Sequence, residues 1–333
     1  MASRKSGSPQ CFTGADPLGR HFTIISPSRA GRPGALASGV LTGDDFSRPD
    51  PHEKCPFCPG NENETPPSTA FQSDKTGAWI GRIVPNRFPA VYAKGVSDPN
   101  AIFGVHEVVI ETPGHNPGWA YPEAPDTAAL WEMILLRIRE HRENRDLKTL
   151  VWFKNQGASA GASLEHPHSQ ILGTSLESPA QKRTNRLAAA DWRREGSSWL
   201  ARLVAREKKA RKRMVFSREG FSVFCPESIR SPYGLWLVPD TYEDPLCPTL
   251  GEAIPFSRVL GETLRRFQVV HGVDAPFNLV LHLRMPGKYP GFGWYLEVLP
   301  RLSQFAGWEW ATETFIHPVK PSDAAKAYRE AKG

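Results

Sequence analysis

Apolar residues recur along this chain with two different periods. Residues 126–145 carry Leu130, Ile134 and Ile138 on one face at helical spacing, which predicts an amphipathic helix. A second helix is predicted over residues 255–271, and a third, strongly basic helical stretch over residues 180–212. Short runs rich in β-branched and aromatic residues predict strands. These runs occupy residues 21–26, 79–84, 105–111, 149–154, 166–172, 221–225, 234–238, 277–283 and 292–300.

The order of the predicted elements repeats along the chain. Residues 126–172 run helix, strand, loop, strand, and residues 255–300 run through the same order. The two stretches share little sequence identity, but their common order suggests duplicated units. The expected fold class is therefore α+β, with an antiparallel sheet and flanking helices in each half.

The composition is that of a globular protein, and the chain lacks the apolar segments expected of membrane-spanning and secreted proteins. Of the 333 residues, 40% are hydrophobic, yet no apolar run reaches the roughly 18 residues that cross a bilayer. The N-terminus lacks the apolar segment of a secretory signal, so we expect a cytoplasmic protein with no membrane partner. The net charge of +6 fits partners that carry phosphate.

The basic stretch at residues 180–212 can be interpreted in three ways. A solvated helix face is the simplest, and a docking surface for an acidic partner is the alternative. A zinc-stabilised nucleic-acid-binding protein would use the same stretch. The chain has no aromatic–basic RNA motif, however, so nucleic acid is the less favoured partner.

The spacing of Cys55 and Cys58 is typical of half a zinc site, because a Cys-x-x-Cys turn can place two thiolates on one tetrahedral ion. Two further ligands must come from elsewhere, and the candidates are His106, His115 and the pair His166 and His168. A redox pair is disfavoured because no thioredoxin-like helix follows Cys55. The odd total of five cysteines also argues against a disulfide framework.

The segment Glu165-His-Pro-His-Ser-Gln170 follows a run of small residues from Gly157 to Ser163. In a strand, residues two apart share a face, so His166, His168 and Gln170 should point the same way. Both histidines could bind metal, or one could bind metal while the other does chemistry. The small residues would let the backbone approach a ligand closely and offer N–H groups to phosphate.

Four segments of the chain read CPFCPGNE, PNRFPA, HEVVIETPGHN and FKNQGASAGASLEHPHSQI. With SPSRAGRP and AGWEWATETFIHP, they resemble the galactose-1-phosphate uridylyltransferase branch of the histidine-triad superfamily, which includes ADP-glucose phosphorylase-like members. The resemblance covers roughly residues 18–330. It implies two histidine-triad-like halves, residues 18–178 with the zinc and the catalytic histidine and residues 179–333 degenerate, after a flexible arm at residues 1–17.

In this branch a histidine attacks the α-phosphorus of a nucleoside diphosphate sugar, and a nucleotidyl-histidine passes the group to a phosphate-bearing acceptor. The resemblance implies that His168 is the nucleophile and that one structural Zn²⁺ is bound by Cys55, Cys58, His115 and His166. It assigns substrate binding to Arg29, Arg32, Asn86, Phe88, Asn155, Ser163, Gln170 and Glu309. It also implies a homodimer.

The second half departs from the family pattern. Cys225 is the first cysteine of a pair whose second position is Ser228, and the strand where relatives carry His-x-His reads Gly293-Trp-Tyr295. A second metal site is therefore expected to be lost, although His282 is present. Where uridylyltransferases carry a glutamine near the C-terminal motif, the chain reads Thr314-Phe315.

The acceptor is the open question, so several functions remain. The leading interpretation is a nucleotidyltransferase acting on a hexose 1-phosphate. The alternatives are an NDP-sugar phosphorylase that uses inorganic phosphate, a dinucleoside polyphosphate hydrolase that uses water, and a nucleotide-binding regulator without activity.

Overall fold

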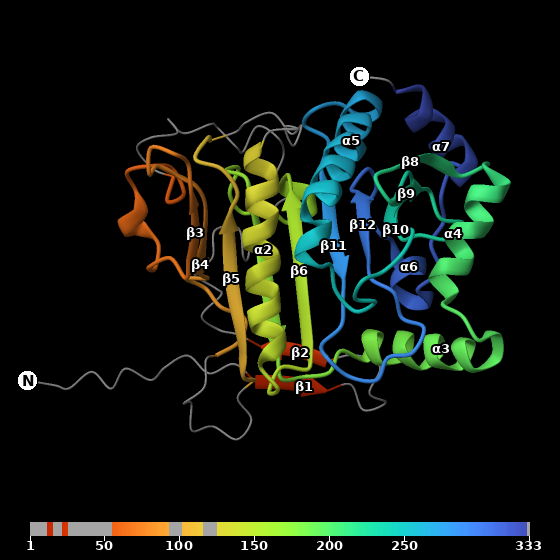
Figure 1. The fold of residues 1–333 in the computed structure, drawn as a ribbon, viewed down its shortest axis with the longest axis horizontal. Coiled ribbons are helices and arrows are strands. Elements are labelled where there is room, and N and C mark those ends of the chain that lie inside the picture. Colours follow the sequence, from red (N-terminus) through yellow and green to blue (C-terminus); the bar gives the residue numbers. More distant parts are fainter. Residues whose placement is uncertain (1–11, 16–21, 26–54, 93–101, 116–124, 332–333) are drawn as a thin grey trace, which may run out of the picture.

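The structure is a computed structural model that describes residues 12–15, 22–25, 55–92, 102–115 and 125–331. Its centre is a sheet of ten strands in the order β3-β4-β5-β7-β6-β11-β12-β10-β9-β8, with every neighbouring pair antiparallel (Figure 1). The strands of this sheet are β3 (Ala70–Ser73), β4 (Trp79–Pro85), β5 (Gly104–Ile110), β6 (Thr149–Gln156), β7 (His168–Thr174), β8 (Met214–Arg218), β9 (Phe221–Phe224), β10 (Leu235–Pro239), β11 (Phe277–His282) and β12 (Tyr295–Pro300). A separate two-stranded sheet pairs β1 (Phe12–Ala15) with β2 (Phe22–Ile25).

The ten-stranded sheet repeats the same arrangement twice. From its edge inward the first half runs β3, β4, β5, β7, β6, and the second half runs β8, β9, β10, β12, β11. The long helix α2 (Pro125–Glu143) lies between β5 and β6 in sequence, and α5 (Ala253–His271) lies between β10 and β11. The α+β class and the repeated order are confirmed, and the halves join where β6 pairs with β11. The predicted boundary at residue 178 falls between β7 and α3.

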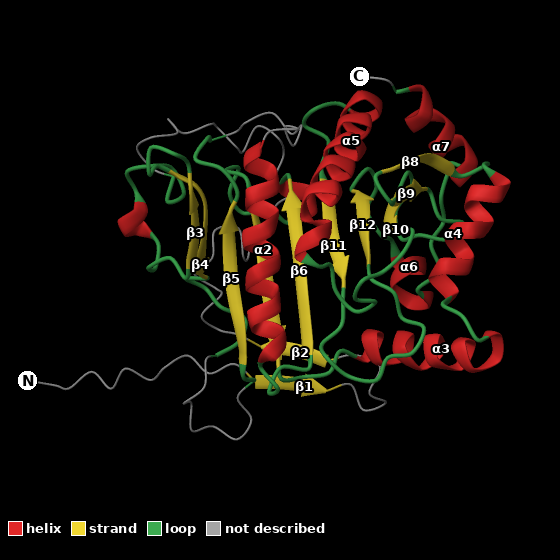
Figure 2. Cartoon of the chain, in the orientation of Figure 1, coloured by secondary structure: helices red, strands yellow, loops and turns green. Residues whose placement is uncertain are grey.

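Helices α2 and α5 lie side by side over one face of the sheet and enclose the main core (Figure 2). Trp131 of α2 packs against Trp152 of β6 and against Phe256 of α5, each with ring centroids 4.8 Å apart. These three side chains are buried. Because the indole N–H of Trp152 donates to Oγ of Ser169, Ser169 faces the helices. Strand alternation then turns His168 and Gln170 toward the opposite face.

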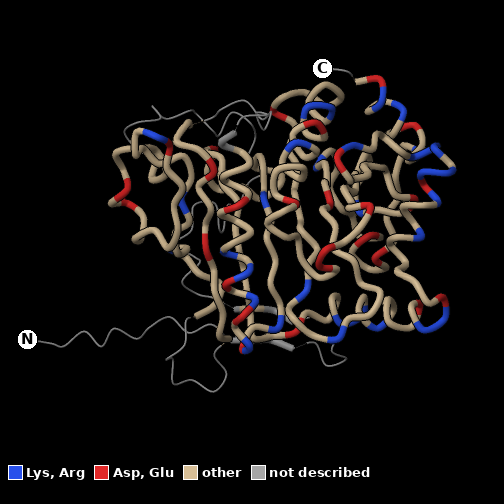
Figure 3. Tube along the Cα trace, in the orientation of Figure 1, with Lys and Arg blue, Asp and Glu red and all other residues tan. Residues whose placement is uncertain are grey.

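The basic stretch forms two helices, not one. These are α3 (Pro179–Glu195) and α4 (Trp199–Ala210). Gly196 ends α3 in the left-handed conformation with φ +68°, which glycine adopts without strain. Residues 179–213 contain twelve Lys and Arg against three Asp and Glu, and their positive charge follows α3 and α4 in Figure 3.

Several short elements had no sequence prediction: β3, β8, α6 (Gly307–Thr312) and α7 (Pro321–Glu330). The expected strand over residues 21–26 is β2, but its partner β1 lies within the stretch expected to be an arm. The remaining short helices are η3 (Glu62–Glu64), η4 (Ala158–Ala160) and η5 (Leu250–Glu252). None of the helices in the described ranges is long and apolar enough to span a membrane.

Candidate active site and metal centre

Four predicted metal ligands come together on the face of the sheet away from α2. Cys55 and Cys58 lie in the turn before η3, His115 follows β5, and His166 comes two residues before β7. Their ligand atoms all lie within 4.8 Å of one another. The gathering of Cys55 and Cys58 with two of the candidate histidines agrees with the prediction, and His106 and His168 are not part of the group.

Three distances between these atoms match those around a tetrahedral ion. Nδ1 of His166 lies 3.7 Å from Sγ of Cys55 and 3.6 Å from Sγ of Cys58, and Nδ1 of His115 lies 3.3 Å from Sγ of Cys58. Two ligands at ordinary Zn–S and Zn–N bond lengths are about 3.6 Å apart in a tetrahedron. The residues present can therefore hold one metal ion.

Hydrogen bonding and burial favour the binding of a cation by the same atoms. Nε2 of His166 donates to the carbonyl of Thr112 at 2.8 Å, so the neutral ring directs its Nδ1 lone pair at the two sulfurs. Burial lowers the pKa of His166 to about 4, which keeps this ring neutral. Burial, together with Cys55, raises the pKa of Cys58 to about 12, so a cation is needed to hold the thiolate form.

His168 is the first residue of β7, and its tautomer is fixed by the neighbouring turn. Its Nδ1 lies 2.8 Å from the carbonyl oxygen of His166, and because a carbonyl only accepts, Nδ1 must donate. The neutral ring of His168 therefore carries its lone pair on Nε2. The ring of Phe57 packs between the two histidines, with centroids 5.9 Å from His166 and 5.6 Å from His168. Of the pair predicted to lie in one strand, only His168 is in β7.

Gln170 is oriented by His106, which the sequence left among the candidate metal ligands. The amide N–H of Ala90 donates to Nδ1 of His106 at 3.0 Å, so the proton of the neutral ring is on Nε2. That Nε2 donates to Oε1 of Gln170 at 2.8 Å, which leaves the NH₂ end of Gln170 as a donor. Nδ2 of Asn86, also predicted at the site, lies 3.2 Å from the same Nε2, but with this tautomer both groups are donors, so the contact is not a hydrogen bond. His106 of β5 and Gln170 of β7 are thus joined, with Asn86 beside them after the end of β4.

The small-residue loop is ordered, not plain coil. Gly157 has φ +78°, and a Cβ there would lie 2.9 Å from Cβ of Pro276, so only glycine fits. Residues 158–160 form η4. The amides of Ala160, Gly161 and Ala162 bond to carbonyls inside the loop, so these three N–H groups are used there and not offered to phosphate as expected.

Asn155 is held by a residue that the sequence did not indicate. Nδ2 of Asn278, on β11, donates to Oδ1 of Asn155 at 2.9 Å and to the carbonyl of Ala160 at 2.8 Å. No short motif marks Asn278, because it comes from the other half of the chain. Only the pairing of β6 with β11 brings the two asparagines together.

The other predicted substrate residues are distributed as follows. Phe88 follows Asn86, whose Oδ1 accepts from the amide of Phe88 at 2.8 Å. Ser163 is half-buried at the end of the small-residue loop. Glu309 is exposed on α6, where it accepts from the amide of Ala306 and caps that helix. No hydrogen bond or ion pair joins Glu309 to the other predicted site residues that the structure describes. Arg29 and Arg32 lie outside the described residues.

At the matching place in the second half, His282 contacts a carboxylate. Nε2 of His282 lies 3.0 Å from Oε2 of Glu297, and its ring stacks on Tyr295 with centroids 4.4 Å apart. The indole N–H of Trp236 donates to the other oxygen of Glu297 at 3.2 Å. Cys225, expected to be the remnant of a cysteine pair, is buried in the main core.

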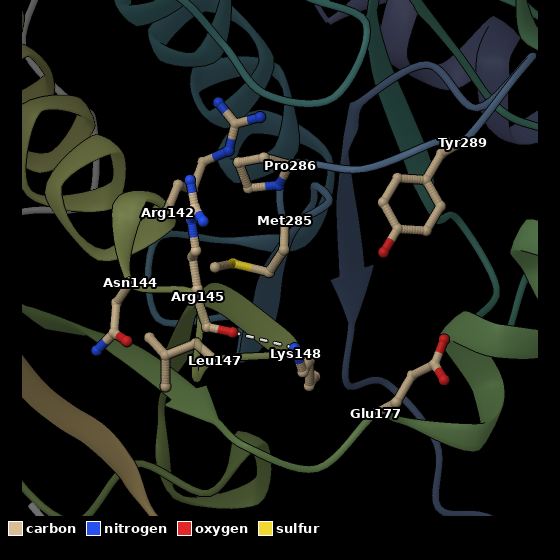
Figure 4. Close-up of a pocket in the computed structure, with 9 residues that line it drawn as sticks. All are labelled: Arg142, Asn144, Arg145, Leu147, Lys148, Glu177, Met285, Pro286 and Tyr289. Atoms are coloured by element: carbon tan, nitrogen blue, oxygen red, sulfur yellow. Dashed lines mark hydrogen bonds between the residues drawn. The ribbon is translucent and has the colours of Figure 1, made fainter. Parts of the chain in front are cut away.

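A separate hollow of about 480 Å³ lies at the other end of β6 from Asn155 (Figure 4). Its lining includes Arg142, Lys148, Met285 and Tyr289. Lys148 precedes the first residue of β6, which pairs with the last residue of β7, whereas His168 is the first. The hollow contains none of the predicted site residues and is not the candidate site.

Known proteins are similar to this chain in the region that contains the site. The galactose-1-phosphate uridyl transferase N-terminal domain model matches residues 97–178, which include His115, Asn155, His166 and His168. ADP-glucose phosphorylase of Arabidopsis thaliana is 27% identical over 95% of this chain and 91% of its own length. The chain is similar to galactose-1-phosphate uridylyltransferases and ADP-glucose phosphorylase. The predicted resemblance is confirmed.

Further relatives support the same conclusion. Galactose-1-phosphate uridylyltransferase of Thermotoga maritima is 27% identical over 68% of this chain and 74% of its own length. The crystal structure of the Arabidopsis ADP-glucose phosphorylase with bound ADP-glucose superposes with a TM-score of 0.75 at 26% identity, covering 96% of this chain and 99% of that one. A uridylyltransferase structure, at 23% identity, shares the fold with a TM-score of 0.76 over 96% of this chain and 98% of that one.

Proposed function

We propose that this chain is a nucleotidyltransferase that takes a nucleoside monophosphate from a nucleoside diphosphate sugar and passes it to a sugar 1-phosphate through His168. The observation that carries the proposal is the hydrogen bond from Nδ1 of His168 to the carbonyl of His166. It fixes the tautomer whose Nε2 lone pair can attack phosphorus. The similarity to galactose-1-phosphate uridylyltransferases and to an ADP-glucose phosphorylase supports it.

The reaction runs in two displacements. Nε2 of His168 forms a bond to the α-phosphorus, the bond from that phosphorus to the bridging oxygen breaks, and sugar 1-phosphate leaves with the electron pair. The ring becomes cationic in the adduct, and its Nδ1–H donates more strongly to the His166 carbonyl. A phosphate oxygen of the acceptor then attacks the same phosphorus, and Nε2 of His168 departs as the neutral base.

Other side chains bind and orient the donor. Gln170, whose carbonyl end is held by His106, would donate its NH₂ to a phosphoryl oxygen and stabilise charge that develops there. Asn155 is held by Asn278 near the end of β6, just before the loop that leads toward His168. We assign the remaining nucleotide and phosphate contacts to Arg29, Arg32, Asn86, Phe88 and Ser163, as the resemblance implies.

Zn²⁺ is the metal that two thiolates and two imidazoles fit best. It would be held by Cys55, Cys58, His115 and His166. With four protein ligands such an ion has no open position, so it supplies structure and no Lewis-acid chemistry. By fixing His166, the four ligands fix the carbonyl that orients His168.

The acceptor has a second candidate. The ADP-glucose phosphorylase of Arabidopsis matches 95% of this chain, a larger share than the Thermotoga uridylyltransferase matches. This favours inorganic phosphate as an alternative to a hexose 1-phosphate. Water as the acceptor, which would make the protein a hydrolase of dinucleoside polyphosphates, has no comparable support.

We also propose a cytoplasmic homodimer. Apolar side chains are exposed together in and around α6, where Trp308 is 55%, Trp310 72% and Ile316 70% exposed. Covering them in a dimer would remove this apolar surface from water. Glu309 lies in the same segment, so a partner subunit is the route by which it would reach a site. The described cysteines are all free thiols, which suits a reducing compartment.

The experiment is intact-mass measurement of the protein after separate incubation with UDP-glucose, UDP-galactose, ADP-glucose and GDP-mannose. An adduct of UMP or AMP mass, absent in His168→Ala, is expected and names the base. Adding glucose 1-phosphate, galactose 1-phosphate or inorganic phosphate to the adduct then identifies the acceptor by the rate at which the added mass disappears. An adduct that persists in His168→Ala overturns the assignment of the nucleophile.

A further inference from the structure

A buried ion pair lies directly behind His168, on the helix-covered face of the sheet. Nζ of Lys154, in β6, donates to Oε2 of Glu111 at 2.5 Å and to the backbone carbonyl of His168 at 3.1 Å. The side chains of Lys154 and Glu111 are 0% and 4% exposed. The reaction described above makes no use of either residue.

Lys154 directly follows the last residue of β6 that pairs with β7, whereas the pairing of β5 with β7 continues further. β6 and β7 pair as far as Phe153 and Gln170, whereas β5 and β7 pair as far as Ile110 and His168. Beyond Phe153, β6 no longer pairs with β7 but stays paired with β11 as far as Gln156. Past the last of these pairs, the ammonium group of Lys154 donates to the carbonyl of His168.

The pair belongs to a set of contacts that holds three consecutive residues of the site. The carbonyl of Thr112 accepts from Nε2 of His166, the amide of Glu111 donates to the carbonyl of Pro167 at 3.1 Å, and Lys154 donates to the carbonyl of His168. The bond between Glu111 and Lys154 links the residues that make the second and third of these contacts. The segment from the metal ligand to the nucleophile is thus held through the ring of His166 and through the carbonyls of Pro167 and His168.

Stability alone does not explain a charged pair at this place. Both groups lose their water, and Oε1 of Glu111 is buried without a hydrogen-bond partner among the described residues. A buried ion pair with such incomplete compensation contributes little to folding, and a well-packed apolar pair commonly replaces it without loss. What an apolar pair cannot do is donate to the carbonyl of His168.

We propose that Lys154 and Glu111 are positioning residues for His168, and this inference rests on the proposed function of His168 as nucleophile. Lys154 fixes the main chain of the nucleophile, and Glu111 keeps the ammonium group charged and in place. A displacement of a reacting atom by about 1 Å can cost about 100-fold in rate. The expected effect is therefore on the chemical step and not on binding of the donor.

The test compares the double variant Lys154→Met/Glu111→Leu with the wild type. The single-turnover rate of nucleotidyl-histidine formation is expected to fall about 100-fold. The dissociation constant of the donor, the zinc content and the melting temperature should stay near those of the wild type. Arg213→Met/Glu207→Leu is the matched control, because it removes another ion pair with a buried glutamate, one that does not contact His168. Its rate should not change.

Two further measurements keep the outcome decisive. Glu111→Gln keeps the shape of the side chain and removes its charge, and should also slow adduct formation. ¹⁵N spectra of the His168 ring, recorded without donor, should show the Nδ1–H tautomer in the wild type and a mixture in the double variant. A double variant with wild-type rate and an unchanged tautomer overturns the inference. If the wild type itself forms no adduct, the proposed function fails, and the tautomer measurement alone decides whether the pair positions His168.

Discussion

Asn278 of the second half donates through one amide group to both Oδ1 of Asn155 and the carbonyl of Ala160, at 2.9 and 2.8 Å. It therefore ties the end of β6 to the turn that leads toward His168. The proposed nucleophile lies in the first half, but the loop before it is supported from the second. The second half is thus part of the site whether or not it has chemistry of its own.

Replacing Asn278 should loosen this loop. Asn278→Ala removes two hydrogen bonds, and we expect it to destabilise the fold by about 1–3 kcal/mol and to weaken donor binding. Asn278→Asp should weaken binding further, because a carboxylate would face two acceptor oxygens. Calorimetric titration with the donor measures the affinity of each variant. Equal affinity in the wild type and Asn278→Asp would contradict this role.

His168→Ala should abolish the covalent adduct and leave the metal centre intact. The imidazole of His168 is not among the four ligand atoms, so zinc content by plasma mass spectrometry should stay at one ion per chain. His166→Ala is the converse control, because it removes a ligand and should lower zinc content. Loss of zinc in His168→Ala would show that the two histidines have been assigned the wrong roles.

Removal of the metal should destabilise the first half. Cys58→Ser, or treatment with a strong chelator, leaves buried thiol and imidazole groups without their shared partner. We expect a fall in melting temperature and a parallel loss of adduct formation, since His166 orients His168 through its carbonyl. Re-adding zinc to the chelated wild type should restore both, whereas the Cys58→Ser protein should not recover.

Gly157 is a position where one methyl group should matter. Gly157→Ala would place Cβ 2.9 Å from Pro276 at φ +78°, and we expect a loss of about 1–3 kcal/mol in unfolding free energy together with reduced activity. Gly196→Ala is the control, because Gly196 has φ +68° with nothing within 4 Å of the added carbon. It should lower stability by about 1 kcal/mol and leave activity unchanged.

Mild acid should destabilise the protein partly through His271. Burial lowers the pKa of this ring to about 4, and its Nε2 bonds to the hydroxyl of Tyr328. A histidine whose folded pKa is depressed stabilises the fold fully above pH 6.5 and loses that contribution as pH falls from 6.5 to 4. Allowing for its partial exposure, the loss from pH 7 to pH 5 should be about 1 kcal/mol greater in the wild type than in His271→Gln. Denaturant unfolding at the two pH values measures it.

Long periodic segments were predictable because their burial pattern is regular. The helix expected over residues 126–145 is α2, and strands such as β5 and β11 fall where apolar β-branched residues gather. Short elements carried too few residues for a period to be seen, as in β3 and α6. The break between α3 and α4 depends on the single residue Gly196, which a continuous basic pattern obscured.

The metal ligands were predictable for a different reason. A Cys-x-x-Cys turn and a His-Pro-His segment constrain their own geometry, so local sequence is enough. Asn278, Lys154 and Glu111 carry no such signal. Asn278 and Asn155 are 123 residues apart, and Lys154 and Glu111 are 43 apart, so only the strand register puts them within hydrogen-bonding distance.

The pairing of β6 with β11 makes each half of the chain depend on the other. Five residue pairs join the two strands, from Phe277 with Gln156 to Leu281 with Trp152. Severing the halves would leave each with an unpaired strand edge, and such edges recruit other chains into aggregates. The second half therefore protects the edge of β6 from other chains, whatever part it takes in the chemistry.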